Sequence, residues 1–392
     1  MRKIGIASLI AVLTVLLAVN ISAAYTLVVD QSSGPYNNIS DALDDAYGDY
    51  FDYGITDTIV VNPGIYDETF EISFPVILKS KKGADVTIIQ TEGSGCDGYG
   101  YGIAITGWNV KIDGFTIRMV PFYTPGYGDT GIVVGGWDLD SPTPWPVEGV
   151  EIRKCTVEFF STGIGILNAV GTQLNENVVR YITDFIACDE APRRSQQPEW
   201  ALYESPGIGV LVFTDYFVPE TGITDTPSVS GTQVSLPATN IFKNRIFENA
   251  SWGIFATFGD FLYIPPSSIS QADGGPSAST PWLRIHNNTL YRNGSFDWEY
   301  PPSNSNLLGM GFYNTMNMDD MPIPILITNT SFLELSEATE VMPIYVGDDV
   351  CTLCEALVSA HGNKVYSKLI SNLGGGSSAI PDITPEAVAA PK

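Results

Sequence analysis

The chain has 392 residues, with 44 acidic side chains against 19 basic ones and a formal net charge of −25. This acidity disfavours nucleic-acid binding and any general affinity for anionic polymers. It fits a solvated extracellular surface or the binding of cations.

The first 24 residues have the three parts of a secretory signal peptide. Arg2 and Lys3 form a basic start, residues 4–19 form an apolar core, and Ser22-Ala23-Ala24 supplies the small residues of a cleavage site. An uncleaved membrane anchor is the alternative for this segment. No later apolar run is long enough to span a bilayer. The mature chain is therefore expected to be secreted or held at the cell surface by partners.

The first elements after this segment are expected to be a strand at residues 25–30 and a helix at residues 39–47. In the helix, apolar residues follow the spacing of one amphipathic face, namely Ile39, Ala42, Leu43, Ala46 and Tyr47. We expect the helix to cap the open end of a repetitive fold, where core and strand edges would otherwise be exposed. Residues 58–61, 70–72, 76–80 and 86–90 are predicted strands of the first coils.

A short motif then recurs: apolar, two spacers, Asn, one spacer, apolar. Its best copies place Asn177, Asn244 and Asn288 at the same position, and Cys155 and Thr330 stand there in two looser copies. A 22-residue period between two copies is typical of a solenoid. Alternating apolar residues within short runs indicate strands.

Each coil is therefore predicted to add two or three short parallel strands to a stack. Asn suits the turn of such a coil because it tolerates left-handed backbone and bonds nearby backbone groups. Stacked Asn side chains also bond one another as a ladder. The ladder is expected to break at Cys155 and Thr330.

These repeats, with residues 35–46 and 57–68, resemble the right-handed parallel β-helix proteins of the pectin-lyase-like superfamily. The resemblance covers about residues 25–345 and implies that fold with an N-terminal helical cap. It implies no single activity, since the superfamily holds lyases, hydrolases, esterases, adhesins and surface proteins. Gly64, Tyr66 and Glu68 match the GxYxE motif of pectin methylesterases, but the QDTL-type and LGRPW-type segments of those enzymes are absent from this sequence. We place the β-helix domain at residues 25–372 and a flexible Gly/Ser/Pro-rich tail at 373–392.

Long insertions flank a second set of strands that begin with Gly-Ile. We expect the insertions to form two walls of a groove and the Gly-Ile strands to form its floor. Aromatic rings suit sugar faces and protein partners, although the same rings can instead hold the loops on the barrel. The candidates for binding a glycan or a partner are Trp137, Trp145, Trp200, Trp298, Tyr300 and Phe255.

The floor itself is predicted to carry no ionisable group. The residues expected to point inward are Ile132, Ile164, Phe185, Ile208, Ile254 and Met310. Period two then turns outward Val133, Gly165, Ile186, Gly209, Phe255 and Gly311. A lyase needs a base and a glycosidase needs two carboxylates. Catalysis would have to use acids of the walls, for which the candidates are Asp189, Glu190 and Glu199.

The Asn-bearing strands carry most of the clustered positive charge. These residues are Lys111, Arg153, Lys154, Lys243, Arg245, Arg284 and His286. An anionic sugar could bind such a strip, and Arg153, Arg245 and His286 are candidate catalytic residues there. Cross-strand pairing with Asp113, Glu151 and Glu176 is the alternative.

Three further features concern metals and covalent chemistry. Asn317, Asp319 and Asp320 are candidate calcium ligands, with an acidic surface turn as the alternative. Cys351 and Cys354 form a CxxC that suits a local disulfide or two free thiols. Cys155 and Cys188 could pair, and Cys96 looks unpaired.

Of five Asn-x-Ser/Thr triplets, those of Asn249 and Asn293 are the best glycan candidates. A helix is expected at residues 355–370.

The leading functional hypothesis is a secreted or cell-surface protein that binds glycans or partner subunits through the loop-walled groove. The first alternative is a polysaccharide lyase or glycoside hydrolase that acts on acidic polysaccharide. The second is a self-associating structural subunit of a surface coat.

Overall fold

The computed structural model describes residues 24–93, 100–120, 129–136, 147–182, 207–214, 238–258, 283–294, 306–314, 325–333, 340–346, 358–361, 363–366 and 383–385. Within these ranges, no helix is long and apolar enough to cross a membrane.

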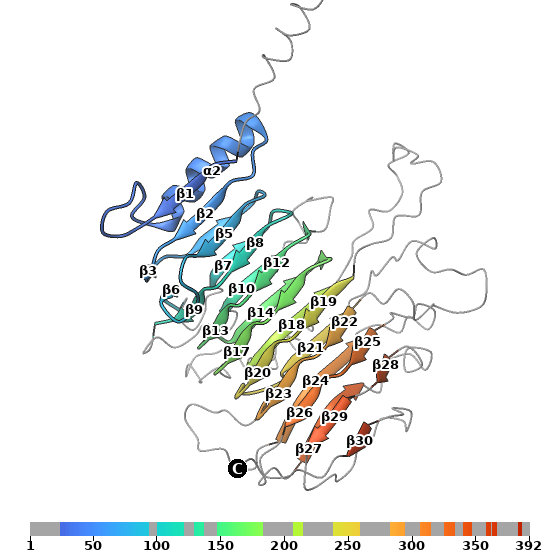
Figure 1. The fold of residues 1–392 in the computed structure, drawn as a ribbon. Coiled ribbons are helices and arrows are strands. Elements are labelled where there is room, and N and C mark those ends of the chain that lie inside the picture. The colour runs from blue at the N-terminus through green and yellow to red at the C-terminus, as the bar shows by residue number, and fades with distance from the viewer. Residues whose placement is uncertain are drawn as a thin grey trace, which may run out of the picture.

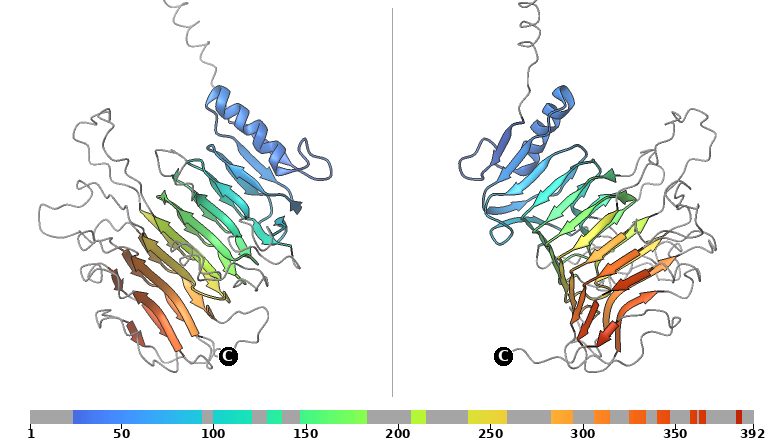
Figure 2. Two further views of the ribbon diagram at one scale, coloured as in Figure 1. Left: turned by 180° about the vertical axis from the view of Figure 1, so that it is seen from behind. Right: turned by 45° about the vertical axis from the view of Figure 1, so that its right-hand side comes forward.

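Three parallel sheets run the length of the molecule (Figures 1 and 2). Sheet A consists of β1 (Thr26–Val29), β2 (Thr58–Val61), β5 (Ile77–Ser80), β8 (Lys111–Asp113), β12 (Glu151–Arg153), β16 (Gln173–Asn175), β19 (Thr239–Phe242), β22 (Leu283–His286), β25 (Ile325–Thr328) and β28 (Val358–His361).

Sheet B consists of β3 (Gly64–Asp67), β6 (Thr87–Thr91), β9 (Thr116–Met119), β13 (Thr156–Glu158), β17 (Val178–Arg180), β20 (Arg245–Phe247), β23 (Thr289–Tyr291), β26 (Ser331–Leu333), β29 (Asn363–Tyr366) and β30 (Ile383–Pro385). Sheet C consists of β4 (Phe70–Ile72), β7 (Tyr101–Ile105), β10 (Thr130–Gly135), β14 (Thr162–Leu167), β18 (Ile208–Thr214), β21 (Ile254–Phe258), β24 (Asn306–Asn314) and β27 (Glu340–Val346). A short parallel pair joins β11 (Val147–Glu148) to β15 (Ala169–Val170).

The chain passes from sheet A to sheet B to sheet C in each coil, as in β12, β13 and β14, and then returns to sheet A. Equivalent residues of successive coils lie in register, so that Ile112, Ile152 and Leu174 form one inward column. All three side chains are buried, and each such burial stabilises the fold by about 1.5–3 kcal/mol. The predicted parallel β-helix is confirmed.

The N-terminal cap is α2 (Ile39–Tyr53), which packs on β1 and β2 (Figure 1). It buries Ile39, Ala42, Leu43 and Ala46, as predicted, but leaves Tyr47 exposed and runs six residues beyond the expected end at 47.

Glu68 holds the start of the capping helix. Its carboxylate accepts hydrogen bonds from the backbone N–H groups of Ile39 at 2.8 Å and Ser40 at 2.9 Å. These N–H groups have no partner within a helix, and a carboxylate there also suits the helix dipole. Tyr66 is buried, and its hydroxyl donates to the carbonyl of Asn62. The GxYxE match therefore has a structural explanation in this chain.

The predicted Asn ladder joins Asn177, Asn244 and Asn288 inside the turn between sheets A and B. The Nδ2 of Asn177 donates to Oδ1 of Asn244, and the Nδ2 of Asn244 donates to Oδ1 of Asn288, each at 3.1 Å. The same oxygens accept backbone N–H groups of the preceding coil at 2.9 Å. At one end, Sγ of Cys155 bonds the carbonyl of Arg153 instead, so the ladder stops there as expected.

Left-handed backbone does not fall on the ladder residues themselves, contrary to the sequence interpretation. It falls one position earlier, on Lys154, Glu176, Lys243, Asn287 and Asn329, with φ between 50° and 57°. That residue turns the chain outward, and the next side chain then points into the core.

A second ladder, which the sequence analysis missed, lies in the turn between sheets B and C. Asn249 donates through Nδ2 to Oδ1 of Asn293 at 2.9 Å, and the backbone N–H of Ile182 donates to Oδ1 of Asn249. Both Asn side chains are fully buried. The expectation that Asn249 and Asn293 carry glycans is therefore wrong, because their amides are used inside the barrel.

The C-terminal region differs from prediction. The helix expected at 355–370 is wrong, since β28 and β29 lie there and extend sheets A and B. Within the expected tail at 373–392, β30 pairs with β29.

One register on sheet C was also predicted wrongly. Val210, rather than Ile208, aligns with the inward Ile164 and Ile254. Ile208 instead joins the buried apolar cluster on the outer side of the sheet. Gly209 is the residue whose missing side chain faces inward, since a Cβ there would lie 2.8 Å from Cγ2 of Ile246.

Two glycines of β14 test this inward and outward assignment. In Gly163→Ala, the added Cβ would lie 2.4 Å from the carbonyl oxygen of Gly209 and 2.6 Å from Cγ1 of Val179. We expect this overpacking to cost about 1–3 kcal/mol of unfolding free energy. Gly165→Ala is the matched control, because its nearest contact is 3.5 Å away. Urea denaturation of both variants checks the assignment, and equal losses of stability would contradict it.

Candidate functional site

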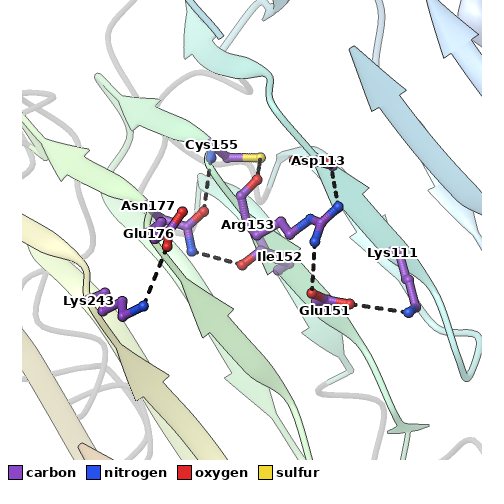
Figure 3. A network of polar contacts seen from close by, with 9 residues as sticks. All are labelled: Lys111, Asp113, Glu151, Ile152, Arg153, Cys155, Glu176, Asn177 and Lys243. Carbon is purple, nitrogen blue, oxygen red and sulfur yellow. Dashed lines mark hydrogen bonds and ion pairs between the residues drawn. The ribbon is translucent and has the colours of Figure 1, made fainter. Parts of the chain in front are cut away.

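On the outer face of sheet A, β8 and β12 form a ladder of ion pairs (Figure 3). Arg153 bonds Asp113 at 2.8 Å and lies 3.7 Å from Glu151, which in turn pairs with Lys111 at 3.3 Å. The hydrogen bond that the Arg153 guanidinium donates to Asp113 is the main cause that raises the pKa of Arg153 above its usual value. The predicted cross-strand pairing thus occupies Arg153.

Further along the same face, the register continues but the carboxylates end. The outward residues of β16, β19 and β22 are Gln173, Asn175, Asn240, Phe242, Arg284 and His286. We call this surface the basic face. It holds Arg284 and His286 and no acidic side chain, while Lys243 in the adjoining turn pairs with Glu176 at 3.7 Å. Because opposite charges are missing within the face, its local charge is positive on an acidic protein.

Polar groups of the basic face are incompletely satisfied within the protein. Oδ1 of Asn175 and Nε of Arg284 are buried and have no hydrogen-bond partner. Asn240 donates to the carbonyl of Ala238 at 2.9 Å. An unpaired buried donor or acceptor is costly, so such groups call for an explanation beyond packing.

His286 is half-buried on this face, and its ring stacks on Phe242 with centroids 5.1 Å apart and planes 4° apart. Burial is the main cause that lowers the pKa of His286, and the charges of Arg284 and Lys243 lower it further. The ring is therefore mainly neutral at pH 7. If Asn287 donates through Nδ2 to Nδ1, at 3.1 Å, the ring proton lies on Nε2.

Sheet B carries a second arrangement, which the sequence analysis missed, over β13, β17, β20 and β23. On the first two of these strands, Glu158 and Arg180 form an ion pair with 2.9 Å between oxygen and nitrogen. On the next two strands, Phe247 and Tyr291 stack with ring centroids 4.4 Å apart. In the turn that follows each strand, the ring pair comes first along the stack and the ion pair second. Phe159 and Tyr181 stack there with ring centroids 5.6 Å apart, and in the next two coils Glu248 pairs with Arg292.

The two aromatic pairs meet along a diagonal, where Tyr181 and Phe247 contact edge to face at 6.4 Å. Arg180 lies over the ring of Tyr181, and Arg245 lies over that of Phe247. Arg245, a predicted catalytic candidate, is therefore on sheet B and is separated from His286, which is on sheet A. Spacings of 22 to 66 residues between the contacting residues hide this checkerboard in the sequence.

The outer side of sheet C is apolar, as predicted, but it is not open. Phe255 is 5% exposed and packs with Leu211 and Trp252 in a buried cluster, which also contains Leu167, Ile208 and Phe213. The candidate Phe255 thus contributes to packing. From β10 to β21, the outward residues Val133, Gly165, Leu211 and Phe255 are not ionisable, whereas past Ala104 the same column ends at the exposed Glu71 of β4.

The remaining candidates lie outside the described residues. These are the wall acids Asp189, Glu190 and Glu199, the aromatic residues Trp137, Trp145, Trp200, Trp298 and Tyr300, the calcium candidates Asn317, Asp319 and Asp320, and the cysteines Cys96, Cys188, Cys351 and Cys354. Within the part of the chain that is described, no group of three or more His, Cys, Asp or Glu residues is placed to hold a metal ion.

No protein-family model matches the chain. No curated protein matches it either. Among solved structures, a pectin methylesterase from carrot aligns over 94% of this chain and 89% of its own, with 9% identity and a TM-score of 0.45. The pectin methylesterase from Aspergillus niger aligns over 94% of this chain and 92% of its own, with 10% identity and a TM-score of 0.44. Pectate lyase Pel9A aligns over 91% of this chain and 82% of its own, with 11% identity and a TM-score of 0.45. These proteins are right-handed parallel β-helices, the fold expected here. At this level the likeness is one of fold and identifies no activity.

The electrostatics of the basic face can be measured through His286. The chain has two histidines, so an NMR titration with His361→Gln assigns both signals. We expect His286 to titrate below 6.5, and Arg284→Gln to raise its pKa because a neighbouring positive charge is removed. Lys82→Gln, on an exposed turn near the N-terminus, is the matched loss of charge and should leave the value unchanged. A pKa for His286 at or above 6.5 in the unaltered protein would contradict this description.

Proposed function

We propose that this protein recognises acidic polysaccharide through the basic face of sheet A, as an exported or cell-surface binding protein. The observation that carries the proposal is the placement of Arg284 and His286 together, with no carboxylate on the described part of that face. On a chain with a net charge of −25, such a face is a specific exception.

The chemistry of the face suits sugar carboxylates and hydroxyls. Arg284 is a cation with a planar set of donors, the arrangement that best fits a carboxylate. When Nδ1 of His286 accepts from Asn287, Nε2–H of the neutral ring is a donor for a sugar oxygen. Phe242 and His286 add ring surface beside these polar groups.

The geometry suits an extended chain rather than a single sugar. Residues of the face repeat from coil to coil at about 4.8 Å, the spacing of neighbouring strands. The face turns directly into sheet B, where Arg245 and the checkerboard of rings follow the same axis. A long acidic glycan could therefore contact several coils at once.

Binding assays with polygalacturonate and with a neutral glucan test the proposal. We expect the native chain to bind the acidic polymer, and salt to weaken that binding because exposed charges are screened. Arg284→Gln should raise the Kd about tenfold, since a charge-assisted hydrogen bond is worth at least about 1.4 kcal/mol.

Lys82→Gln is the control variant, with the same loss of charge near the N-terminal end of the stack. Equal weakening by both variants would mean that net charge, rather than the basic face, sets the affinity. Parallel measurement of new chain ends separates binding from cleavage. Strong binding of the neutral glucan, unaffected by Arg284→Gln, would overturn the proposal.

A further inference from the structure

One oxygen of a buried carboxylate near the N-terminal cap lacks a hydrogen-bond partner. Asp57, just before β2, is 0% exposed. Its Oδ1 accepts a hydrogen bond from the backbone N–H of Tyr25 at 2.7 Å, while its Oδ2 is buried and has no hydrogen-bond partner. A buried carboxylate with one satisfied oxygen is costly unless a cation lies beside it.

The surroundings of Asp57 are acidic. Burial is the main cause that raises the pKa of Asp57, the Tyr25 N–H opposes it, and the neighbouring Asp49 raises it further. Tyr36 donates through its hydroxyl to Asp45 at 2.6 Å, and its pKa is raised to about 12, by Asp45 first, then by burial and by the charges of Asp49 and Asp57. Among the described residues, none of the ion pairs involves these three carboxylates.

Tyr25 is also the first residue after the predicted signal peptide. Ser22-Ala23-Ala24 has the small residues that suit cleavage, and both Ala24 and Tyr25 are exposed. Strand β1 begins at the next residue and pairs with β2 at the edge of the stack. The backbone nitrogen that cleavage would free is therefore the atom that already bonds Asp57.

We propose that the chain is cleaved between Ala24 and Tyr25, and that the new α-ammonium group of Tyr25 forms an ion pair with Asp57. In the cleavage step, water adds to the Ala24 carbonyl carbon and the C–N bond breaks. Ala24 keeps the oxygen as a carboxylate, and the Tyr25 nitrogen takes up protons to become an ammonium group. A protease that cleaves exported precursors catalyses the step.

The consequence is a cap that is completed by processing. An amide nitrogen has one N–H, whereas an ammonium group has three, so a second donor can reach Oδ2 of Asp57. The positive charge also offsets the mutual repulsion of Asp49 and Asp57. The ion pair ties the start of β1 to the segment between α2 and β2, so the processed chain has a tighter cap than its precursor.

The first test is the N-terminal sequence of the exported protein, which we expect to begin at Tyr25. The second compares three folded forms: a chain that begins at Tyr25 with a free amine, the same chain with the amine acetylated, and a chain that keeps Ala23 and Ala24. We expect the free amine to give the highest melting temperature and the slowest hydrogen exchange in β1. An exported chain that begins at another residue overturns the proposal.

Asp57→Asn should abolish the difference between the free and the acetylated chains. Asp44→Asn, an exposed carboxylate on α2, is the matched control and should preserve it. A difference that survives in Asp57→Asn overturns the ion pair.

The pH dependence gives a readout that does not require a variant to fold. An ordinary α-amino group has a pKa of about 7.7–8.0, and pairing with Asp57 should raise it in the folded chain. The added stability is then present below about pH 7.7 as long as Asp57 is ionised, and it is lost as pH rises through the raised pKa of the α-amino group. Asp45 and Asp49 lie near Asp57, and their negative charges act in the same direction, whereas Tyr36, with its pKa raised to about 12, is uncharged in this pH range. An α-amino pKa in the ordinary range overturns the pairing.

Discussion

Register between coils is the physical constraint on which the rest of this structure depends. Each inward side chain of one coil lies over its equivalent in the next, as Ile112, Ile152 and Leu174 do. Each inward side chain therefore contacts the side chain at the same position of the next coil, and only residue types that can stack in this way fit there. Apolar side chains fill the core, and amides succeed where they can both donate and accept, as Asn177, Asn244 and Asn288 do. Glycine succeeds where a Cβ would meet the next coil, as at Gly163.

The same register decides what the outer faces can do. A column of like charges would be unstable, so charges alternate along β8 and β12, and the Asp113–Arg153 pair is one result. On sheet B, ion pairs and ring pairs alternate between the strand and the turn. Where alternation stops, as at Arg284 and His286, no carboxylate of the basic face offsets the positive charge. That exception distinguishes the basic face from the self-paired surface beside it.

Much of the fold could be predicted from the sequence because the repeat exposes it directly. The amide motif, the alternating strands and the helical cap each have a local pattern. Features that depend on the alignment of distant coils could not be predicted in this way. Ile208 lies between Gly207 and Gly209, so the Gly-Ile pattern fits two alignments, and only the pairing of β18 with β14 decides between them. The triplets of Asn249 and Asn293 look like glycan acceptors until their second ladder buries them. The segment at 355–370 becomes two strands because pairing with β25 and β26 outweighs its helical pattern.

The candidate site shows the same division. The cluster of basic residues is visible in the sequence, and so is their pairing with Asp113, Glu151 and Glu176. Strand register decides which of these basic residues have an acidic neighbour, and for this reason Arg153 is paired and Arg284 is not.

The most direct test of this account is hydrogen–deuterium exchange of the full mature chain with and without an acidic uronic oligosaccharide. The account predicts protection centred on β19 and β22, with little change over β8 and β12. Protection confined to sheet C and its insertions, or no protection at saturating ligand, would contradict it.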